Sequence, residues 1–122
     1  EQERMSPEEF GRTRAANMCS ASASDEAKAA VASIASEIRT SGYRAAIHLL
    51  SVSDNSAEVG RLGIPVLVLA GAEDKIAPED ATATLTAAIP GARREIIARA
   101  GHAAYLEQPE AYNARLRAFL DA

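Results

Sequence analysis

Apolar and polar positions follow a helical period in the first part of the chain. Over residues 25–38 apolar side chains recur every three or four positions, which is typical of an amphipathic helix. Ser6 as a helix cap, Pro7 after it and Glu9 three residues after the cap predict the start of a helix over residues 7–18. A third helix is expected over residues 43–52, and Ser41 and Gly42 are expected to end the second helix. The three helices are short and rich in alanine. We therefore expect them to cover another element rather than to form a core of their own.

The second part of the chain alternates strands and helices. Residues 64–70 form a continuous apolar run, typical of a strand that is buried on both faces of a parallel sheet. A helix is expected over residues 78–88, a second strand over 93–98, and a last helix from Pro109 onward. The order strand, helix, strand, helix predicts parallel pairing with a right-handed crossover, and therefore an α/β fold.

Two strands alone make an incomplete sheet. The strand over residues 64–70 would pair with the strand over residues 93–98 and leave unpaired backbone groups at its other edge. We expect a further strand to pair with this edge, supplied by another polypeptide segment or by a second copy of the chain.

Composition and charge argue against several classes of partner. The 122 residues include 13 Lys and Arg and 17 Asp and Glu, a net charge of −4, and the basic residues are scattered. Nucleic acids and membranes are therefore not expected as partners. The charged segment from Glu1 to Arg4 does not resemble a signal peptide, and Cys19 has no second cysteine to pair with. These features predict a cytoplasmic protein. The only histidines, His48 and His102, are far apart in the sequence, so no metal or other cofactor is expected.

An acid and a histidine follow the ends of the two predicted strands. Asp74 comes shortly after the first strand, and His102 follows the second. Because the carboxyl ends of parallel strands meet at one edge of a sheet, we expect these side chains to lie within hydrogen-bonding distance. A carboxylate bound to one ring nitrogen of histidine leaves the other nitrogen free to act as a general base. The chain contains no G-x-S-x-G motif, so a nucleophile is expected from elsewhere.

The two loops resemble those of the α/β-hydrolase family. Residues 64–78, IPVLVLAGAEDKIAP, are similar to the family's strand and acid loop, and residues 100–113, AGHAAYLEQPEAYN, are similar to its histidine loop. Residues 1–56 resemble the helical lid of the enol-lactonase and carbon–carbon hydrolase branch, and residues 57–122 resemble the C-terminal part of the core. The resemblance covers the whole chain but only the later half of a family member. It implies a helical lid followed by the last two parallel strands and helices of an α/β-hydrolase core.

The resemblance also implies a hydrolase that acts on a small ester, lactone or related acyl substrate. In this hypothesis Asp74 orients His102, and Ile76 and Ala103 line the substrate pocket. Glu73 is the alternative acid, but the family pattern places the acid three residues after the glycine. The nucleophile would come from an N-terminal hydrolase fragment; pairing in a homo-oligomer would complete only the sheet. The alternative hypothesis is a hydrolase half that is not catalytic and serves as an interaction or oligomerisation module.

Other polar residues have simpler interpretations. His48 lies beside two leucines in a predicted helix, and we expect it to be a surface or packing residue. Tyr105 and Tyr112 are expected to pack against neighbouring side chains. Cys19 is expected to be a small buried residue.

Overall fold

The computed structural model describes residues 5–122, so the charged segment from Glu1 to Arg4 lies outside the described residues. The elements follow in the order α1 (Pro7–Met18), α2 (Asp25–Ser36), α3 (Thr40–Val52), α4 (Ser56–Val59), β1 (Leu67–Gly71), α5 (Glu79–Ala88), β2 (Arg93–Ile97), α6 (Ala104–Glu107) and α7 (Pro109–Leu120). β1 and β2 pair in parallel, with Leu67 opposite Arg93 and Gly71 opposite Ile97. The predicted α/β class is confirmed.

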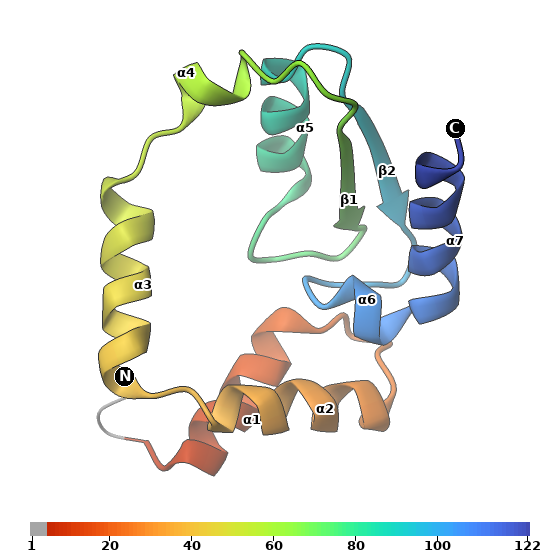
Figure 1. Cartoon of the computed structure of the whole chain (residues 1–122). Helices are drawn as coiled ribbons and strands as arrows, with labels where there is room; N and C mark the ends of the chain where they lie inside the picture. Colours follow the sequence, from red (N-terminus) through yellow and green to blue (C-terminus); the bar gives the residue numbers. More distant parts are fainter. Residues whose placement is uncertain (1–4) are drawn as a thin grey trace.

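The helices of the C-terminal part lie against the two strands. α5 connects β1 to β2 and contacts both, and α7 packs beside β2 (Figure 1). Ile97, Ala100 and Ala104 form a buried cluster at the end of β2, and Tyr112 of α7 packs against it. The ring of Tyr112 also meets that of Tyr105 edge to face, with centroids 6.2 Å apart. The packing expected for the two tyrosines is therefore present.

β1 is less buried than its sequence predicts. Only Ala70 is buried in this strand, and the other residues of Leu67–Gly71 are partly exposed. Within the described residues β2 is the only strand that pairs with β1. The prediction of burial on both faces is wrong for this structure, because the described helices that pack on the two strands, α5 and α7, leave part of the faces of β1 exposed. β1 is therefore more apolar than its partly exposed position in the described structure requires.

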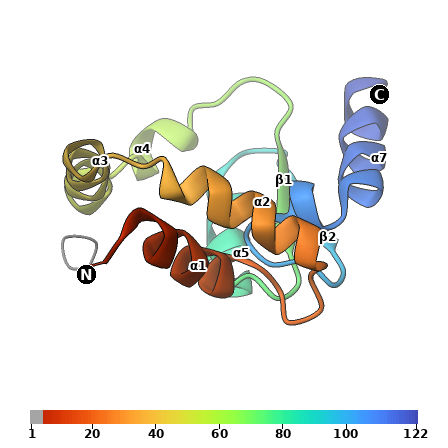
Figure 2. The same cartoon turned by 90° about the horizontal axis from the view of Figure 1, so that it is seen from below.

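α1 and α2 pack against each other at the carboxyl ends of the strands. In Figure 1 both strands point toward this helix pair, and Figure 2, seen from below, shows the two helices side by side in front of the strands. The predicted start of α1 is present as a capping box between Ser6 and Glu9. A Cβ on Gly11 would lie 2.3 Å from the carbonyl oxygen of Ala32, so only glycine permits this close approach of the helices.

The boundary between α2 and α3 differs from the prediction. α2 ends at Ser36, and Ser41 and Gly42 lie inside the first turn of α3 instead of ending α2. The last buried residue of α2 is Ala35, so packing does not hold the helix beyond that turn. No residue of α3 is buried. α3 therefore contributes little to the core of the described chain.

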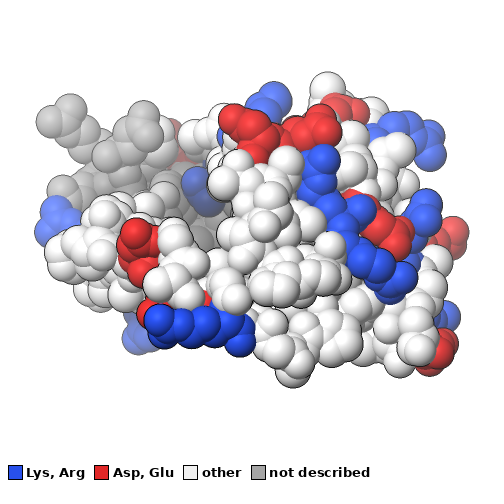
Figure 3. Space-filling view, turned by 90° about the horizontal axis from the view of Figure 1, so that it is seen from above, with Lys and Arg blue, Asp and Glu red and all other residues white. Residues whose placement is uncertain are grey.

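The surface carries charges of both signs. On the face in Figure 3, Lys and Arg atoms lie next to Asp and Glu atoms around a broad uncharged area. Two of the ion pairs join Arg94 to Glu79 at 3.3 Å and Arg115 to Glu95 at 3.1 Å. In the part of the chain that the structure describes, no helix has the length and apolar character needed to cross a membrane.

Candidate active site

Two loops meet beyond the carboxyl ends of β1 and β2. In the loop after β1, the backbone N–H of Ala72 donates to the carbonyl of Ile97 at 2.9 Å, and that of Glu73 donates to the carbonyl of Ala100 at 2.8 Å. A Cβ on Gly71 would lie 2.1 Å from the carbonyl oxygen of Gly101. Glycine at position 71 is therefore required for the two loops to approach this closely. The loops deliver Asp74 and His102 to the same place.

Asp74 and His102 form the expected hydrogen bond. His102 Nδ1 lies 2.9 Å from Asp74 Oδ2. The other carboxylate oxygen of Asp74 accepts hydrogen bonds from the backbone N–H groups of Ile76 at 2.8 Å and Ala77 at 2.9 Å. The Asp74 side chain is 7% exposed and that of His102 is 36% exposed. The carboxylate is thus fixed at Nδ1 of the imidazole. Nε2 of His102 makes no hydrogen bond to the described residues.

The surroundings of Asp74 favour its ionised form. Burial alone raises the pKa of Asp74, but hydrogen bonds from Ala77, His102 and Ile76 outweigh burial and hold the pKa below its usual value. Asp74 is therefore a carboxylate at neutral pH. A carboxylate at Nδ1 selects the imidazole tautomer with its proton on that nitrogen, which leaves the Nε2 lone pair available to accept a proton.

Glu107 fastens the histidine loop to the loop after α1. Its Oε1 accepts from the backbone N–H of Gly101 at 2.9 Å, and its Oε2 accepts from that of Ser20 at 2.8 Å. The backbone N–H of His102 also donates to the carbonyl of Met18 at 2.7 Å. Sequence reasoning treats Glu107 only as part of the continuation of the histidine loop and does not identify this bridge. The only feature of the sequence that could indicate this bridge is a carboxylate a few residues after the Gly-His pair.

The alternative acid does not reach the histidine. Glu73 Oε2 accepts from the backbone N–H of Ala21 at 3.2 Å, and no hydrogen bond joins it to His102 in the described residues. Ile76 is 45% exposed beside the acid loop. Ala103 is completely buried, in a cluster with Ala15, Cys19, Ala23 and Val31. Its side chain has no free surface for a substrate in this structure, in contrast to its expected place in the pocket.

The remaining candidates lie apart from this pair or are buried. His48 is exposed on α3. Cys19 is buried, and this burial, with the nearby charge of Glu107, raises the pKa of its thiol. Residues 5–122 contain no group of three or more His, Cys, Asp or Glu side chains that could hold a metal ion.

The chain matches a known protein family. A model of the alpha/beta hydrolase fold matches residues 10–109. Among curated proteins, the 2-hydroxy-6-oxononadienedioate/2-hydroxy-6-oxononatrienedioate hydrolase of Cupriavidus pinatubonensis is 35% identical over 68 residues, which are 56% of this chain and 24% of that protein. A thermophilic esterase from Thermogutta terrifontis has a similar structure, with a TM-score of 0.85 and 24% identity over 97% of this chain and 45% of that one.

The enol-lactonase from Burkholderia xenovorans LB400 is also similar in structure. Its TM-score is 0.72 with 24% identity, over 78% of this chain and 36% of that one. The chain thus spans less than half the length of each of these three proteins. The two solved structures show the shared fold, and the family model covers most of the chain. The chain therefore belongs to the α/β-hydrolase fold family.

Proposed function

We propose that this chain supplies the acid and the base of a hydrolase that acts on a small ester, lactone or related acyl substrate. The observation that carries the proposal is the 2.9 Å hydrogen bond between Asp74 and His102, with Asp74 fixed and His102 partly open. The similar proteins named as a hydrolase, an esterase and an enol-lactonase support this class of reaction.

The proposal assigns the nucleophile to another segment, because the chain has no G-x-S-x-G motif. This segment would be an N-terminal hydrolase fragment of the same protein or of a partner chain. His102 Nε2 takes the proton of a serine hydroxyl as its oxygen attacks the substrate carbonyl. The bond to the leaving group breaks, and His102 returns the proton to that group. His102 then takes a proton from water as the water attacks the acyl group on the serine. The bond to the serine oxygen breaks, His102 returns the proton to that oxygen, and the acid is released.

Within residues 1–56, α1 and α2 would act as a lid over this chemistry. α1 and α2 lie at the carboxyl ends of the strands, and Met18, Ser20 and Ala21 are hydrogen bonded to the two loops of the site. A cover in this position excludes water and shapes the choice of substrate.

Ester hydrolysis by Asp74→Asn tests the assignment of the acid. The purified polypeptide or complex that contains this chain is first defined by intact mass, and kcat is then measured with p-nitrophenyl butyrate. Asp74→Asn is expected to lower kcat by a factor on the order of thousands, because an amide at Nδ1 favours the wrong imidazole tautomer. Glu73→Gln is the matched control, because glutamine keeps an acceptor for Ala21.

Three outcomes are informative. A large loss in Asp74→Asn with near-normal turnover in Glu73→Gln supports the proposal. The reverse result would assign the acid to Glu73. Unchanged hydrolysis in both variants, or no hydrolysis by a preparation that includes a nucleophile-bearing segment, would favour the alternative of an interaction module.

A further inference from the structure

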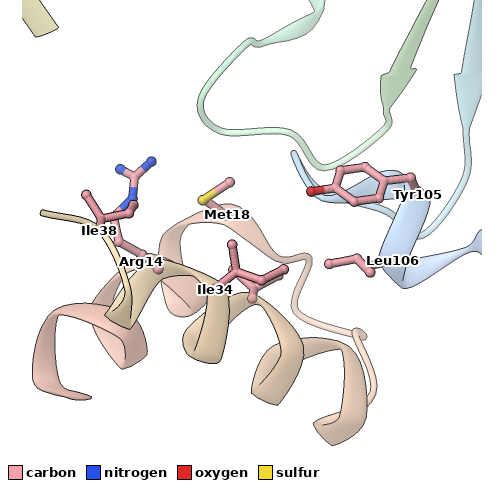
Figure 4. A pocket seen from close by; sticks show the side chains of 8 residues that line it. Arg14, Met18, Ile34, Ile38, Tyr105 and Leu106 are labelled. Carbon is pink, nitrogen blue, oxygen red and sulfur yellow. The ribbon is translucent and has the colours of Figure 1, made fainter. Parts of the chain in front are cut away.

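An apolar pocket lies between the helix pair and α6, next to the histidine loop. It has a volume of about 130 Å³, and its lining includes Met18, Ile34, Ile38, Tyr105 and Leu106 (Figure 4). This size fits a short acyl chain rather than a large ligand. The lining would desolvate apolar carbon atoms, which favours binding of a hydrocarbon chain.

One charged residue belongs to this pocket. Of the eight residues that line it, only Arg14 carries a charge, and its side chain is partly buried. Within residues 5–122 the Arg14 guanidinium has no ion pair or hydrogen bond, whereas Arg94 and Arg115 are each paired with a glutamate. A partly buried cation beside apolar side chains is costly without a counter-charge. Arg14 therefore presents unused donors to an anionic ligand.

The pocket runs from this cation to α6, the helix that follows the histidine in the sequence. Met18 follows Arg14 by one helical turn, a rise of about 6 Å, and the Met18 carbonyl accepts from the N–H of His102 at 2.7 Å. Figure 4 shows the Arg14 nitrogen atoms toward one end of the pocket and the Tyr105 hydroxyl toward the other, with Met18 between them. Tyr105 lies on α6, three residues after His102. A ligand along the pocket would thus have one end near Arg14 and the other near Tyr105 of α6.

We infer that the pocket binds the acyl chain of a substrate that carries a carboxylate at its far end, and that Arg14 recognises this carboxylate. The inference rests on the proposed function, because it places the reacting ester or lactone at the α6 end of the ligand, where His102 would act on it. The planar guanidinium matches the two oxygen atoms of a carboxylate. A single cation balances a carboxylate of charge −1 better than a phosphate of charge about −2. The substrate class is therefore a short dicarboxylic acid esterified at one end.

The kinetic test compares an anionic with a neutral ester in the protein or complex that contains this chain. The kcat/KM is measured for mono-p-nitrophenyl adipate and for p-nitrophenyl hexanoate, which have acyl chains of the same length. Wild type is expected to prefer the anionic ester, and Arg14→Gln is expected to lower this preference about ten- to a hundredfold. Arg12→Gln is the matched control, because Arg12 is exposed on the same helix and does not line the pocket. Its preference should be that of wild type.

A binding measurement separates this inference from the proposed function. Monomethyl adipate, dimethyl adipate and hexyl phosphate are titrated into the same preparations and followed by NMR. Arg14-dependent preference for monomethyl adipate, without hydrolysis of either nitrophenyl ester, would support the pocket and contradict the hydrolase. Hydrolysis of both esters with the same relative rates in wild type and Arg14→Gln would overturn the inference and leave the hydrolase standing. Tighter Arg14-dependent binding of hexyl phosphate would overturn the choice of a carboxylate. Unchanged binding of dimethyl adipate by Arg14→Gln shows that the variant is folded.

Discussion

Both carboxylate oxygens of Asp74 accept hydrogen bonds, one from a side chain and the other from the backbone. One oxygen is bonded to the His102 ring, whereas the other accepts from two backbone N–H groups of its own loop, at Ile76 and Ala77. The backbone donors hold the carboxylate in place independently of the ring. Asp74 can therefore keep His102 in the same orientation during a proton transfer, because its own carboxylate does not rotate.

The lowered pKa of Asp74 predicts a pH-dependent effect of Asp74→Asn on stability. The folded state favours the ionised carboxylate, so this contribution is complete above the unfolded pKa of about 3.9. It is lost as pH falls through the lower folded pKa. In urea unfolding of the polypeptide or complex that contains this chain, Asp74→Asn should therefore lower the free energy of unfolding at pH 6 and much less near pH 2. Asp121→Asn, at the exposed C-terminal end, is the control. A destabilisation that stays the same at both pH values would contradict this prediction.

Residues differ in how far their roles can be predicted from sequence. The proximity of Asp74 and His102 can be predicted from sequence, because each follows the end of a strand and the ends of parallel strands lie at the same edge of a sheet. Glu107 and Ala103 cannot be placed in this way. The bridge made by Glu107 and the burial of Ala103 depend on contacts with α1, α2 and their connecting loop, more than 70 residues away in the sequence. Periodicity carries no information on such contacts.

At the scale of elements, two glycines set the distance between loops. The site of a Cβ on Gly71 is occupied by the Gly101 carbonyl, and a Cβ on Gly101 would lie 2.4 Å from the Met18 carbonyl. β1, the histidine loop and the end of α1 are therefore stacked with backbone against backbone. This stacking brings the acid, the base and the helix pair together.

Gly71→Ala is expected to destabilise the fold strongly. The methyl group would lie 2.1 Å from a backbone oxygen, so the two loops must separate, at a cost of about 3 kcal/mol. Gly42→Ala is the matched control, because a Cβ there meets nothing within 4 Å and alanine favours the helix by about 0.5–1 kcal/mol. In the polypeptide or complex that contains this chain, the two variants should shift the Tm of thermal unfolding in opposite directions. Equal Tm values for Gly71→Ala and wild type would contradict the stacked arrangement.

Element boundaries were harder to predict than element types. The apolar run before Gly71 predicts a strand, and the alanine-rich periodic segments predict helices, as observed. The position where α2 ends depends on where its packing against α1 stops, so Gly42 misleads as a stop signal. The helices α4 and α6 have four residues each, too few for a periodic pattern to appear.

For the whole molecule, the described chain has both exposed apolar side chains and an open strand edge. Leu49 and Leu50 of α3 are 62% and 75% exposed, and Ile64 before β1 is 65% exposed. Within residues 5–122, β1 pairs on one side only. The exposed apolar side chains and the strand edge would both be covered by further strands of a hydrolase core.

We predict that the 122-residue chain alone is not a stable monomer. Each unpaired backbone group that becomes buried costs about 1–3 kcal/mol, and a small domain has little stability to offset this. Light scattering and native mass spectrometry of the isolated chain should show self-association or an unfolded chain. Addition of a nucleophile-bearing fragment should give a defined complex. A monodisperse monomer that unfolds cooperatively would mean that further strands are dispensable.

Turnover of a small ester by His102→Ala tests the central claim most directly. The claim is that His102, held by Asp74, acts as the general base of a completed hydrolase. In the purified polypeptide or complex that contains this chain, loss of the His102 ring should lower kcat by at least about a thousandfold. His48→Ala, which removes the other histidine from an exposed position on α3, should leave kcat near that of wild type. Turnover by His102→Ala equal to that of His48→Ala would contradict the claim.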